Sequence, residues 1–157
     1  PWVSLRPSVF VTNFVGMWSA QIRAGDVVRG PYAAASSSPI VESDIAEVAA
    51  RALLSDDLLG RKIPLTGPQS LTNTEMVDVV AAVLGRPLQY QEAPDELVRQ
   101  RFIGLGFPPA FGDAYIAMLA STVNQPAPVT DDVQHILGRP ARSFEQWVIE
   151  HRNIFEN

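Results

Sequence analysis

The chain has 157 residues, of which 46% are hydrophobic and 18% charged, and its 12 basic and 17 acidic residues give a net charge of −5 at pH 7. This length suits one domain with a buried core, and the acidic balance argues against nucleic-acid binding, which needs a basic surface. The sequence has no cysteine, which excludes disulfides, thiolate chemistry and cysteine-ligated metals. It also has no apolar run of the roughly 20 residues that a membrane span needs. We therefore expect a soluble, cytoplasmic protein without nucleic-acid or membrane partners.

The first part of the chain alternates between short β-type runs and stretches of helical periodicity. A strand at 2–5 is predicted to stop at Arg6-Pro7, because proline cannot donate a hydrogen bond to a β-ladder. Apolar residues recur at helical spacing over 13–24, and Gly25 is the predicted stop. The small-residue stretch 32–39 is predicted to be a loop without packed structure. Further strands are predicted at 27–28, 62–66 and 88–92, and further helices at 44–54 and 73–84.

The second part of the chain is predicted to be mostly helical. Capping-box patterns, in which a Ser or Thr and the Glu or Gln three residues later bond each other's backbone, open helices at Thr72 and Ser143. The remaining helices are predicted at 95–105, 110–123, about 131–137 and 143–155. The sequence therefore predicts an α/β fold in one compact unit, with the α/β elements in residues 1–92 and a helical region in residues 93–157.

Several catalytic and phosphate-binding motifs are absent from the sequence. The nearest match to Gly-x-Gly-x-x-Gly is Gly104-Leu105-Gly106, but Pro109 stands at the third glycine position and the segment follows a helix. No Gly-Lys-Ser/Thr phosphate loop, Gly-x-Ser-x-Gly nucleophile elbow or Tyr-x-x-x-Lys pair occurs. The chain alone therefore lacks the usual means of holding a dinucleotide.

Isolated acid–base candidates exist, each with a simpler structural explanation. Asp44 lies two residues after Glu42 and could take part in proton transfer, but it is also placed to cap the helix that begins there, as is Ser43. His135 is expected on a helix surface, and no set of convergent metal ligands surrounds it, so no metal is expected. The weak catalytic candidates are Tyr32, Asp44 and His135.

Short phrases distributed along the whole chain carry a family resemblance. They are Leu5-Arg6-Pro7-Ser8-x-Phe10-x-x-Asn13, Asp44-Ile45-Ala46, Leu65-Thr66-Gly67-Pro68, Leu71-Thr72 with Glu75, Leu84-Gly85-Arg86, Leu137-Gly138-Arg139-Pro140 and Ser143-Phe144-Glu145-Gln146-Trp147-Val148. In this order and spacing, the chain resembles the C-terminal half of the atypical short-chain dehydrogenase/reductase group, specifically the NmrA-like NAD(P)-binding proteins.

The resemblance implies the C-terminal part of a Rossmann-type parallel sheet with a mostly helical substrate-binding region. By this analogy, the residues at the junction of cofactor and substrate are Pro7, Ser8, Phe10 and Asn13. The analogous candidates for the substrate pocket are Phe14, Met17, Trp18 and Tyr32. Periodicity alone is equally consistent with Phe14, Met17 and Trp18 as core residues. NAD(P)H is the cofactor implied, but the family's glycine-rich loop lies in the half that precedes this segment, so binding by this chain alone is expected to be weak or absent.

Three functional hypotheses follow. The leading one is the substrate-side half of an NAD(P)-dependent oxidoreductase that acts on a small, largely apolar metabolite, with its sheet completed by a missing N-terminal half or by a second copy. The second is a truncated, cofactor-independent cyclase or isomerase that uses Tyr32, Asp44 or His135 for proton transfer. The third is a non-catalytic, redox-sensing regulator that binds NAD(P).

Overall fold

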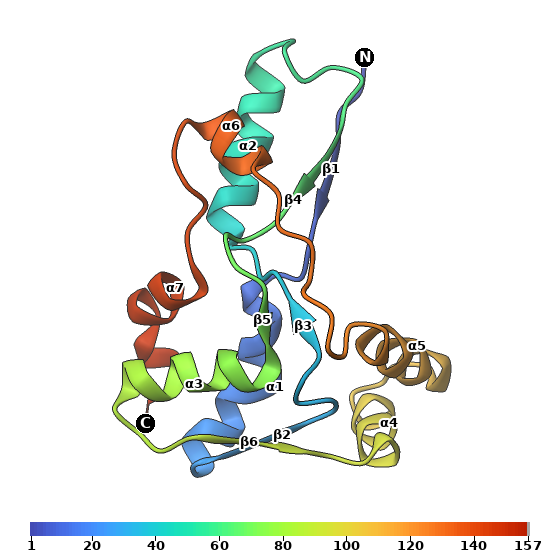
Figure 1. Cartoon of the computed structure of the whole chain (residues 1–157). Coiled ribbons are helices and arrows are strands. Elements are labelled where there is room, and N and C mark those ends of the chain that lie inside the picture. Colours follow the sequence, from blue (N-terminus) through green and yellow to red (C-terminus); the bar gives the residue numbers. More distant parts are fainter. Residues whose placement is uncertain (157) are drawn as a thin grey trace.

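The computed structural model describes residues 1–156, which form an α/β fold with helices packed around short, mostly parallel strands (Figure 1). The strands are β1 (Ser4–Pro7), β2 (Val27–Gly30), β3 (Ser36–Ser37), β4 (Lys62–Leu65), β5 (Leu71–Thr72) and β6 (Gln89–Glu92). The helices are α1 (Val11–Ala24), α2 (Glu42–Leu54), α3 (Asn73–Leu84), α4 (Asp95–Gly104), α5 (Pro109–Ala120), α6 (Asp132–Leu137) and α7 (Phe144–Glu150), followed by the 3₁₀ turn η1 (Arg152–Ile154). The predicted alternation of strand and helix, followed by a mostly helical part, is confirmed.

The parallel pair β1–β4 extends further along the chain than the sequence predicted. The backbone N–H of Ser4 donates to the Arg61 carbonyl at 3.0 Å, and that of Ser8 donates to the Leu65 carbonyl at 2.8 Å. Since alternate residues of a strand direct their main-chain groups to opposite edges, the nitrogen of Pro7 faces away from β4. The prediction of a strand at 2–5 that stops before Arg6-Pro7 was therefore wrong: both residues lie within β1, which ends at Pro7, because the missing N–H falls on the edge that β4 does not use. Within residues 1–156, no strand pairs with that other edge of β1.

The small-residue segment after β2 is packed, contrary to the prediction of an unpacked loop. It contains β3, which pairs antiparallel with β5, and it buries Ala35, Ser36 and Ser38. The Ser36 hydroxyl donates to the Gln125 carbonyl at 2.5 Å, and the Ser38 hydroxyl donates to the Pro128 carbonyl at 2.7 Å. Small side chains permit this because they let two backbone segments approach closely.

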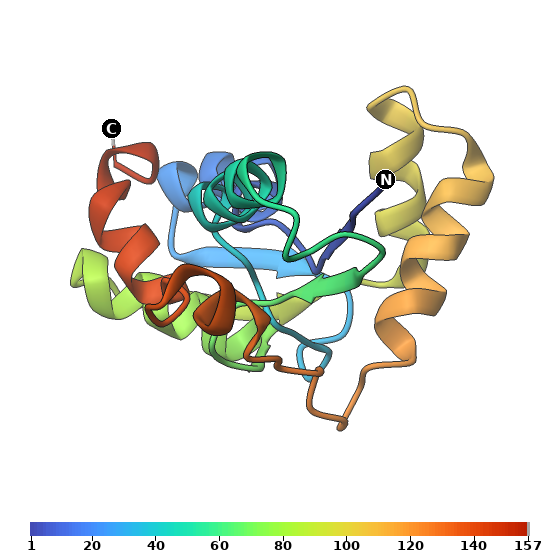
Figure 2. The same ribbon diagram turned by 90° about the horizontal axis from the view of Figure 1, so that it is seen from above.

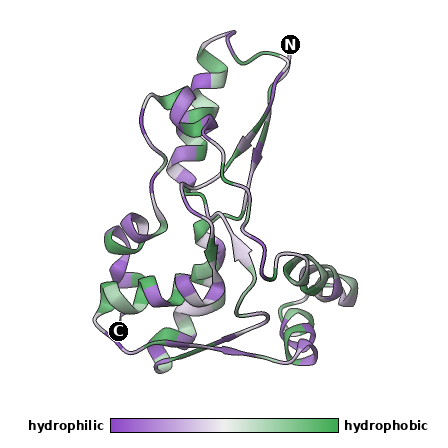
Figure 3. Cartoon of the chain, viewed as in Figure 1, coloured by the Kyte–Doolittle hydropathy of each residue, from purple (hydrophilic) through white to green (hydrophobic). Residues whose placement is uncertain are grey.

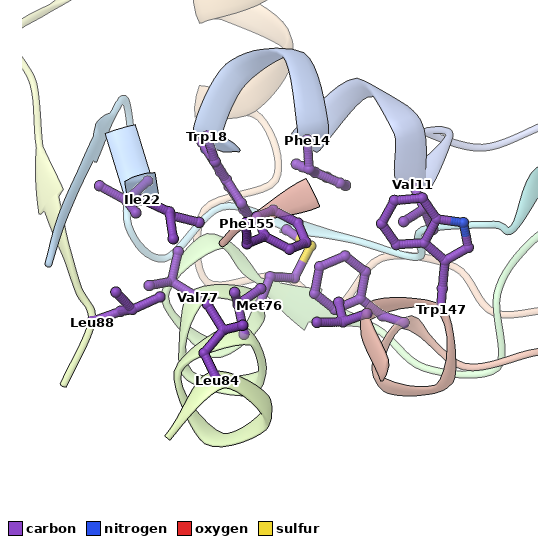
Figure 4. Close-up of a cluster of buried hydrophobic side chains, with 14 of the residues drawn as sticks. Val11, Phe14, Trp18, Ile22, Met76, Val77, Leu84, Leu88, Trp147 and Phe155 are labelled. Atoms are coloured by element: carbon purple, nitrogen blue, oxygen red, sulfur yellow. The ribbon is translucent and has the colours of Figure 1, made fainter. Parts of the chain in front are cut away.

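The main hydrophobic core lies between α1, α3 and α7 (Figure 4). Phe14 and Trp18 of α1 face Met76 of α3 across this core, and Trp147 of α7 lies at its end. A second, smaller cluster packs α2 and α6 against β4, with Val48, Ile63, Leu65 and Val133 all 1% exposed or less. These two clusters fix α1 and β1 relative to the rest of the chain.

Several helix ends agree with the sequence patterns, but the start of α2 does not, and α5 and α7 end before the predicted residues 123 and 155. The capping boxes of Thr72 and Ser143 are both present, and Gly85 ends α3 in the left-handed region at φ +66°. Helix α2, however, begins at Glu42 after Val41, which makes no side-chain capping bond. The prediction that Ser43 or Asp44 caps this helix was wrong, because both residues already lie within its first turn.

Helices α4 and α5 form an antiparallel hairpin that stands beside the rest of the chain (Figure 2). Apolar residues are frequent along α5 (Figure 3) and several remain exposed, among them Phe111 at 42% and Met118 at 53%. No helix in the described part of the chain is long and apolar enough to cross a membrane. The boundary between residues 92 and 93 stays a prediction.

Candidate functional site

The segment that leaves the carboxyl end of β1 is held on both sides by backbone hydrogen bonds. On one side, Ser8 is bonded to Leu65 of β4, as described above. On the other side, the Ile40 N–H donates to the Val9 carbonyl at 2.9 Å, and the Val11 N–H donates to the Ile40 carbonyl at 3.0 Å. In open parallel sheets, ligands bind outside the carboxyl ends of the strands. This end of β1 therefore provides a rigid backbone where such a ligand would lie.

The four residues predicted to contact a cofactor at the carboxyl end of β1 differ in exposure and in the hydrogen bonds that they already make. Pro7 and Ser8 are half-buried, and the Ser8 hydroxyl donates to the Ser38 carbonyl. Phe10 is 38% exposed at the start of α1, and Asn13 is exposed in its first turn. Among the residues described, the Asn13 side chain has no hydrogen-bond partner. Phe10 and Asn13 are therefore the two side chains that remain available to a ligand.

Of the four residues predicted to line the substrate pocket, two are buried in the core and two are half-buried. Phe14 and Trp18 are 5% and 3% exposed, with ring centroids 4.7 Å apart, and they belong to the main core. This burial agrees with the alternative that the periodicity left open, in which Phe14 and Trp18 are core residues. Met17 is half-buried and packs against the edge of this core, and the Tyr115 hydroxyl lies 3.4 Å from its sulfur. Met17 therefore joins α1 to the α4–α5 hairpin.

Tyr32 lies after β2 in an unusual backbone conformation. Its φ of +46° is in the left-handed region, which a bulky aromatic residue rarely adopts. The buried Asn73 side chain holds this turn, since its amide donates to the carbonyls of Pro31 at 3.2 Å and Tyr32 at 3.0 Å. The Tyr32 hydroxyl lies 3.4 Å from a carboxylate oxygen of Asp95 at the start of α4. Tyr32 thus links β2 to the α4–α5 hairpin.

The carboxylate of Asp44 is enclosed by ion pairs and hydrogen bonds that hold the fold together. Its side chain is fully buried, and it accepts hydrogen bonds from Arg139 Nη2 at 2.9 Å, from the Arg142 backbone N–H at 2.7 Å and from Arg142 Nη1. Both guanidinium groups also bind Glu47, and the hydrogen bond from Arg139 is the main reason that the pKa of Glu47 is lowered. Since both oxygens of Asp44 are engaged, the carboxylate joins α2 to the segment before α7 and is not placed for proton transfer.

The three weak catalytic candidates do not share a site. Asp44 is enclosed by Arg139 and Arg142, Tyr32 is bonded to Asp95, and His135 is exposed on α6 without a hydrogen-bond partner in the described part of the chain. Residues 1–156 also contain no group of three or more His, Asp or Glu side chains placed to hold a metal ion. The arrangement offers no support for the cofactor-independent cyclase or isomerase.

Two surface pockets lie away from the carboxyl end of β1. One has a volume of about 300 Å³ and is lined mainly by polar residues of the β3–β5 region, including Ser36, Thr72 and Glu75. The other, of about 160 Å³, lies near the start of α6 and includes Thr130 and Asp131. Neither contains any of the predicted cofactor or substrate residues.

The α4–α5 hairpin carries an aromatic cluster that was not predicted from the sequence. The Phe102 ring centroid lies 5.0 Å from those of both Phe111 and Tyr115, and Phe107 stacks on Phe111 at 4.5 Å. The spacing of Phe107, Phe111 and Tyr115 is four residues, which places Phe111 and Tyr115 on one helix face. That repeat is visible in the sequence and could have indicated the cluster. Burial raises the pKa of Tyr115, so its hydroxyl stays protonated at neutral pH.

The chain is similar to parts of known reductases. A (4-alkanoyl-5-oxo-2,5-dihydrofuran-3-yl)methyl phosphate reductase of Streptomyces griseus is 33% identical over 156 residues, which cover 99% of this chain and 55% of that protein. An NAD(P)H azoreductase of Xenophilus azovorans is 32% identical over 155 residues, covering 98% of this chain and 54% of that protein. The chain thus spans about half the length of the curated relatives it matches. No family model matches it.

Solved structures show the same fold at low sequence identity. A triphenylmethane reductase of Citrobacter sp. complexed with NADP(H) has a TM-score of 0.75 at 16% identity, covering 93% of this chain and 51% of that one. An NADPH-dependent quinone oxidoreductase from Escherichia coli complexed with NADPH has a TM-score of 0.77 at 15% identity, covering 94% and 52%. The predicted Rossmann-type α/β fold is confirmed. The predicted resemblance to NAD(P)-binding oxidoreductases is also confirmed, because the relatives that the chain matches belong to that class.

Proposed function

We propose that this chain forms the substrate-side part of an NAD(P)H-dependent reductase that acts on a small, largely apolar acceptor. The observation that carries the proposal is the carboxyl end of β1, where Phe10 and Asn13 present exposed side chains on a backbone fixed by β4 and Ile40. The reductases among the curated relatives support the same reaction class.

The residues present fit one end of a nicotinamide dinucleotide. The Asn13 amide can both donate and accept a hydrogen bond, as a nicotinamide carboxamide requires, and the half-exposed Phe10 ring offers an apolar surface. A pyrophosphate needs backbone N–H groups on a glycine-rich turn between strand and helix, and the chain has no such motif. The proposed partner is therefore a segment that supplies this turn and pairs with the unused edge of β1. A second copy of this chain could pair with that edge, but it has no such turn.

When bound, a nicotinamide dinucleotide would supply a hydride to the acceptor. Asn13 would orient the nicotinamide end by hydrogen bonding, and Phe10 would exclude water from one side of the acceptor. Met17 lies one helical turn beyond Asn13 and continues the same face of α1 toward the α4–α5 hairpin. The Tyr32 hydroxyl, with Asp95 as its neighbour, is the proposed source of the proton that reduction requires.

The test uses the protein expressed from its complete reading frame, with NADH or NADPH and a panel of azo and quinone acceptors. We expect cofactor oxidation that is coupled to acceptor reduction. Replacing Asn13 by Ala should lower kcat/KM by roughly tenfold, since one well-placed hydrogen bond contributes about 1.4 kcal/mol. The exposed Asn153 in η1 offers a matched control, and Asn153→Ala should leave kcat/KM unchanged.

Two results would contradict the proposal. Equal kcat/KM values for Asn13→Ala and Asn153→Ala would show that the carboxyl end of β1 is not part of the active site. Cofactor binding without turnover of any acceptor would favour the redox-sensing regulator instead.

A further inference from the structure

The aromatic cluster of the α4–α5 hairpin extends from its exposed tip to α1. At the tip, the stacked rings of Phe107 and Phe111 are 41% and 42% exposed. Phe102 contacts both of these rings and Tyr115, with centroid distances of 5.0 to 5.7 Å. The Tyr115 hydroxyl reaches Met17 on α1 at 3.4 Å. A continuous row of rings therefore connects the tip of the hairpin to the helix that carries Asn13.

A positive charge without an acidic partner lies at the α1 end of this row. Nη2 of Arg101 donates to the Met17 carbonyl at 2.8 Å, and within residues 1–156 no carboxylate lies within ion-pair distance of its guanidinium group. Arg99 on the same helix differs, since it pairs with Asp113 at 2.6 Å and with Glu96 at 3.7 Å. Arg101 is exposed, so its guanidinium group can still bind an anion from solution.

Helix α1, whose Met17 carbonyl Arg101 binds, is exposed at Asn13 and Gly16. Asn13 and Met17 are four residues apart on the helix and share one face, with Gly16 beside them. A Cβ atom added at Gly16 would meet no other atom within 4 Å. A ligand that extends from Arg101 along the row of rings would meet the exposed Phe107 and Phe111 at its other end.

We propose that this surface binds an electron acceptor with a flat apolar body and an anionic group, such as a carboxylate, sulfonate or phosphate ester. The rings of Phe107 and Phe111 contact the flat body, because aromatic groups stack well on one another. Arg101 binds the anion, since a guanidinium group matches the geometry of oxyanions. This inference rests on the proposed function, because it names the acceptor class for the same site.

The test compares two fluorescent probes that have the same N-phenylnaphthylamine body. One is 8-anilinonaphthalene-1-sulfonate, which is anionic, and the other is N-phenyl-1-naphthylamine, which is neutral. Fluorescence titration of the 157-residue chain with each probe measures binding without any need for cofactor or turnover. In Arg101→Gln, we expect the Kd of the anionic probe to rise roughly three- to tenfold, the range for a charge-assisted hydrogen bond at an exposed site, and that of the neutral probe to stay within about twofold.

Two further variants separate this site from general effects of charge and from loss of structure. Arg51→Gln removes an exposed positive charge at the far end of α2, and it should change neither Kd. Phe111→Ala should weaken both probes, because it removes the stacking surface that they share. Far-UV circular dichroism of each variant reports whether the fold is retained.

The outcomes for the inference and for the reductase proposal can be told apart. Equal effects of Arg101→Gln on both probes, or equal effects of Arg101→Gln and Arg51→Gln on the anionic probe, would overturn the inference. If Arg101→Gln weakens only the anionic probe but the protein reduces no acceptor, the anion-binding site is supported and only the reductase proposal is overturned.

Discussion

The buried carboxylate of Asp44 allows a quantitative test of what holds the second half of the chain to the first. The substitution Asp44→Asn keeps the size of the side chain but removes the charge that Arg139 and Arg142 share. Both arginines belong to the segment between α6 and α7, so the substitution weakens the attachment of α7 as well as that of α2. We expect a loss of stability and no direct effect on ligand contacts at β1.

The magnitude follows from the exposure of the three side chains. Asp44 is fully buried, whereas the side chains of Arg139 and Arg142 are 31% and 33% exposed. Removing one partner of a buried ion pair costs about 3–5 kcal/mol. Because water can hydrate both guanidinium groups here, we expect about 2–3 kcal/mol for Asp44→Asn. For a protein of this size, that loss lowers Tm by about 4–12 °C.

Thermal and urea unfolding, followed by circular dichroism, measure this loss directly. Glu47→Gln is the matched control, since Glu47 binds the same two arginines but its side chain is 45% exposed. We expect it to destabilise the protein less than Asp44→Asn does. An unchanged urea midpoint for Asp44→Asn, or a larger loss for Glu47→Gln, would refute the reasoning that burial determines the contribution.

Three further predictions follow from other parts of the structure. The pKa of Glu75 is lowered because the backbone N–H and the hydroxyl of Thr72 donate to its carboxylate. The ionised carboxylate therefore stabilises the fold above its ordinary pKa of 4.5, and this contribution is lost as the pH falls through the lowered pKa. The urea midpoints of wild type and Glu75→Gln should differ at pH 7 and should become equal well below the lowered pKa. Gly67→Ala should lower the free energy of unfolding by about 3 kcal/mol or more, because the added Cβ would lie 1.9 Å from the Pro39 carbonyl oxygen. Gly85→Ala should lower it by only about 1 kcal/mol, because Gly85 lies in open space and only its φ of +66° is unfavourable for alanine. Equal urea midpoints for these two variants would contradict this prediction. The 157-residue chain alone should bind NADH and NADPH weakly or not at all, because it lacks a glycine-rich turn, and low-micromolar binding by the monomer in a calorimetric titration would show otherwise.

Local patterns in the sequence predicted most of the helices and strands. The capping boxes of Thr72 and Ser143 depend on residues three apart, and both appear in the structure because the interaction is local. The strand end at Pro7 was misjudged because the cost of proline depends on which edge of the strand is paired, which is a tertiary property. The packed segment at Ser36 and Ser38 was missed for the same reason, since its partners lie about 90 residues away.

Single residues of the candidate site were harder to predict than the fold. Asp44 and Arg139 appeared in separate family-like phrases, and only the folded chain shows that these phrases meet in one ion-pair cluster. Phe14 and Trp18 carry the same helical periodicity whether they line a pocket or a core, so periodicity could not separate the two roles. Arg101 carries no local signal at all, because an unpaired charge is recognised only when its spatial neighbours are known.

The position of Asn13 beside the reacting end of the cofactor is the central claim, and nuclear magnetic resonance tests it most directly. The measurement follows the side-chain amide signals of Asn13, assigned by their loss in Asn13→Ala, in the protein from the complete reading frame. We predict that NADPH shifts these signals, whereas 2′-phospho-ADP-ribose, which lacks the nicotinamide ring, leaves them in place. Signals that do not move at saturating NADPH, or that move equally with both ligands, would contradict the account.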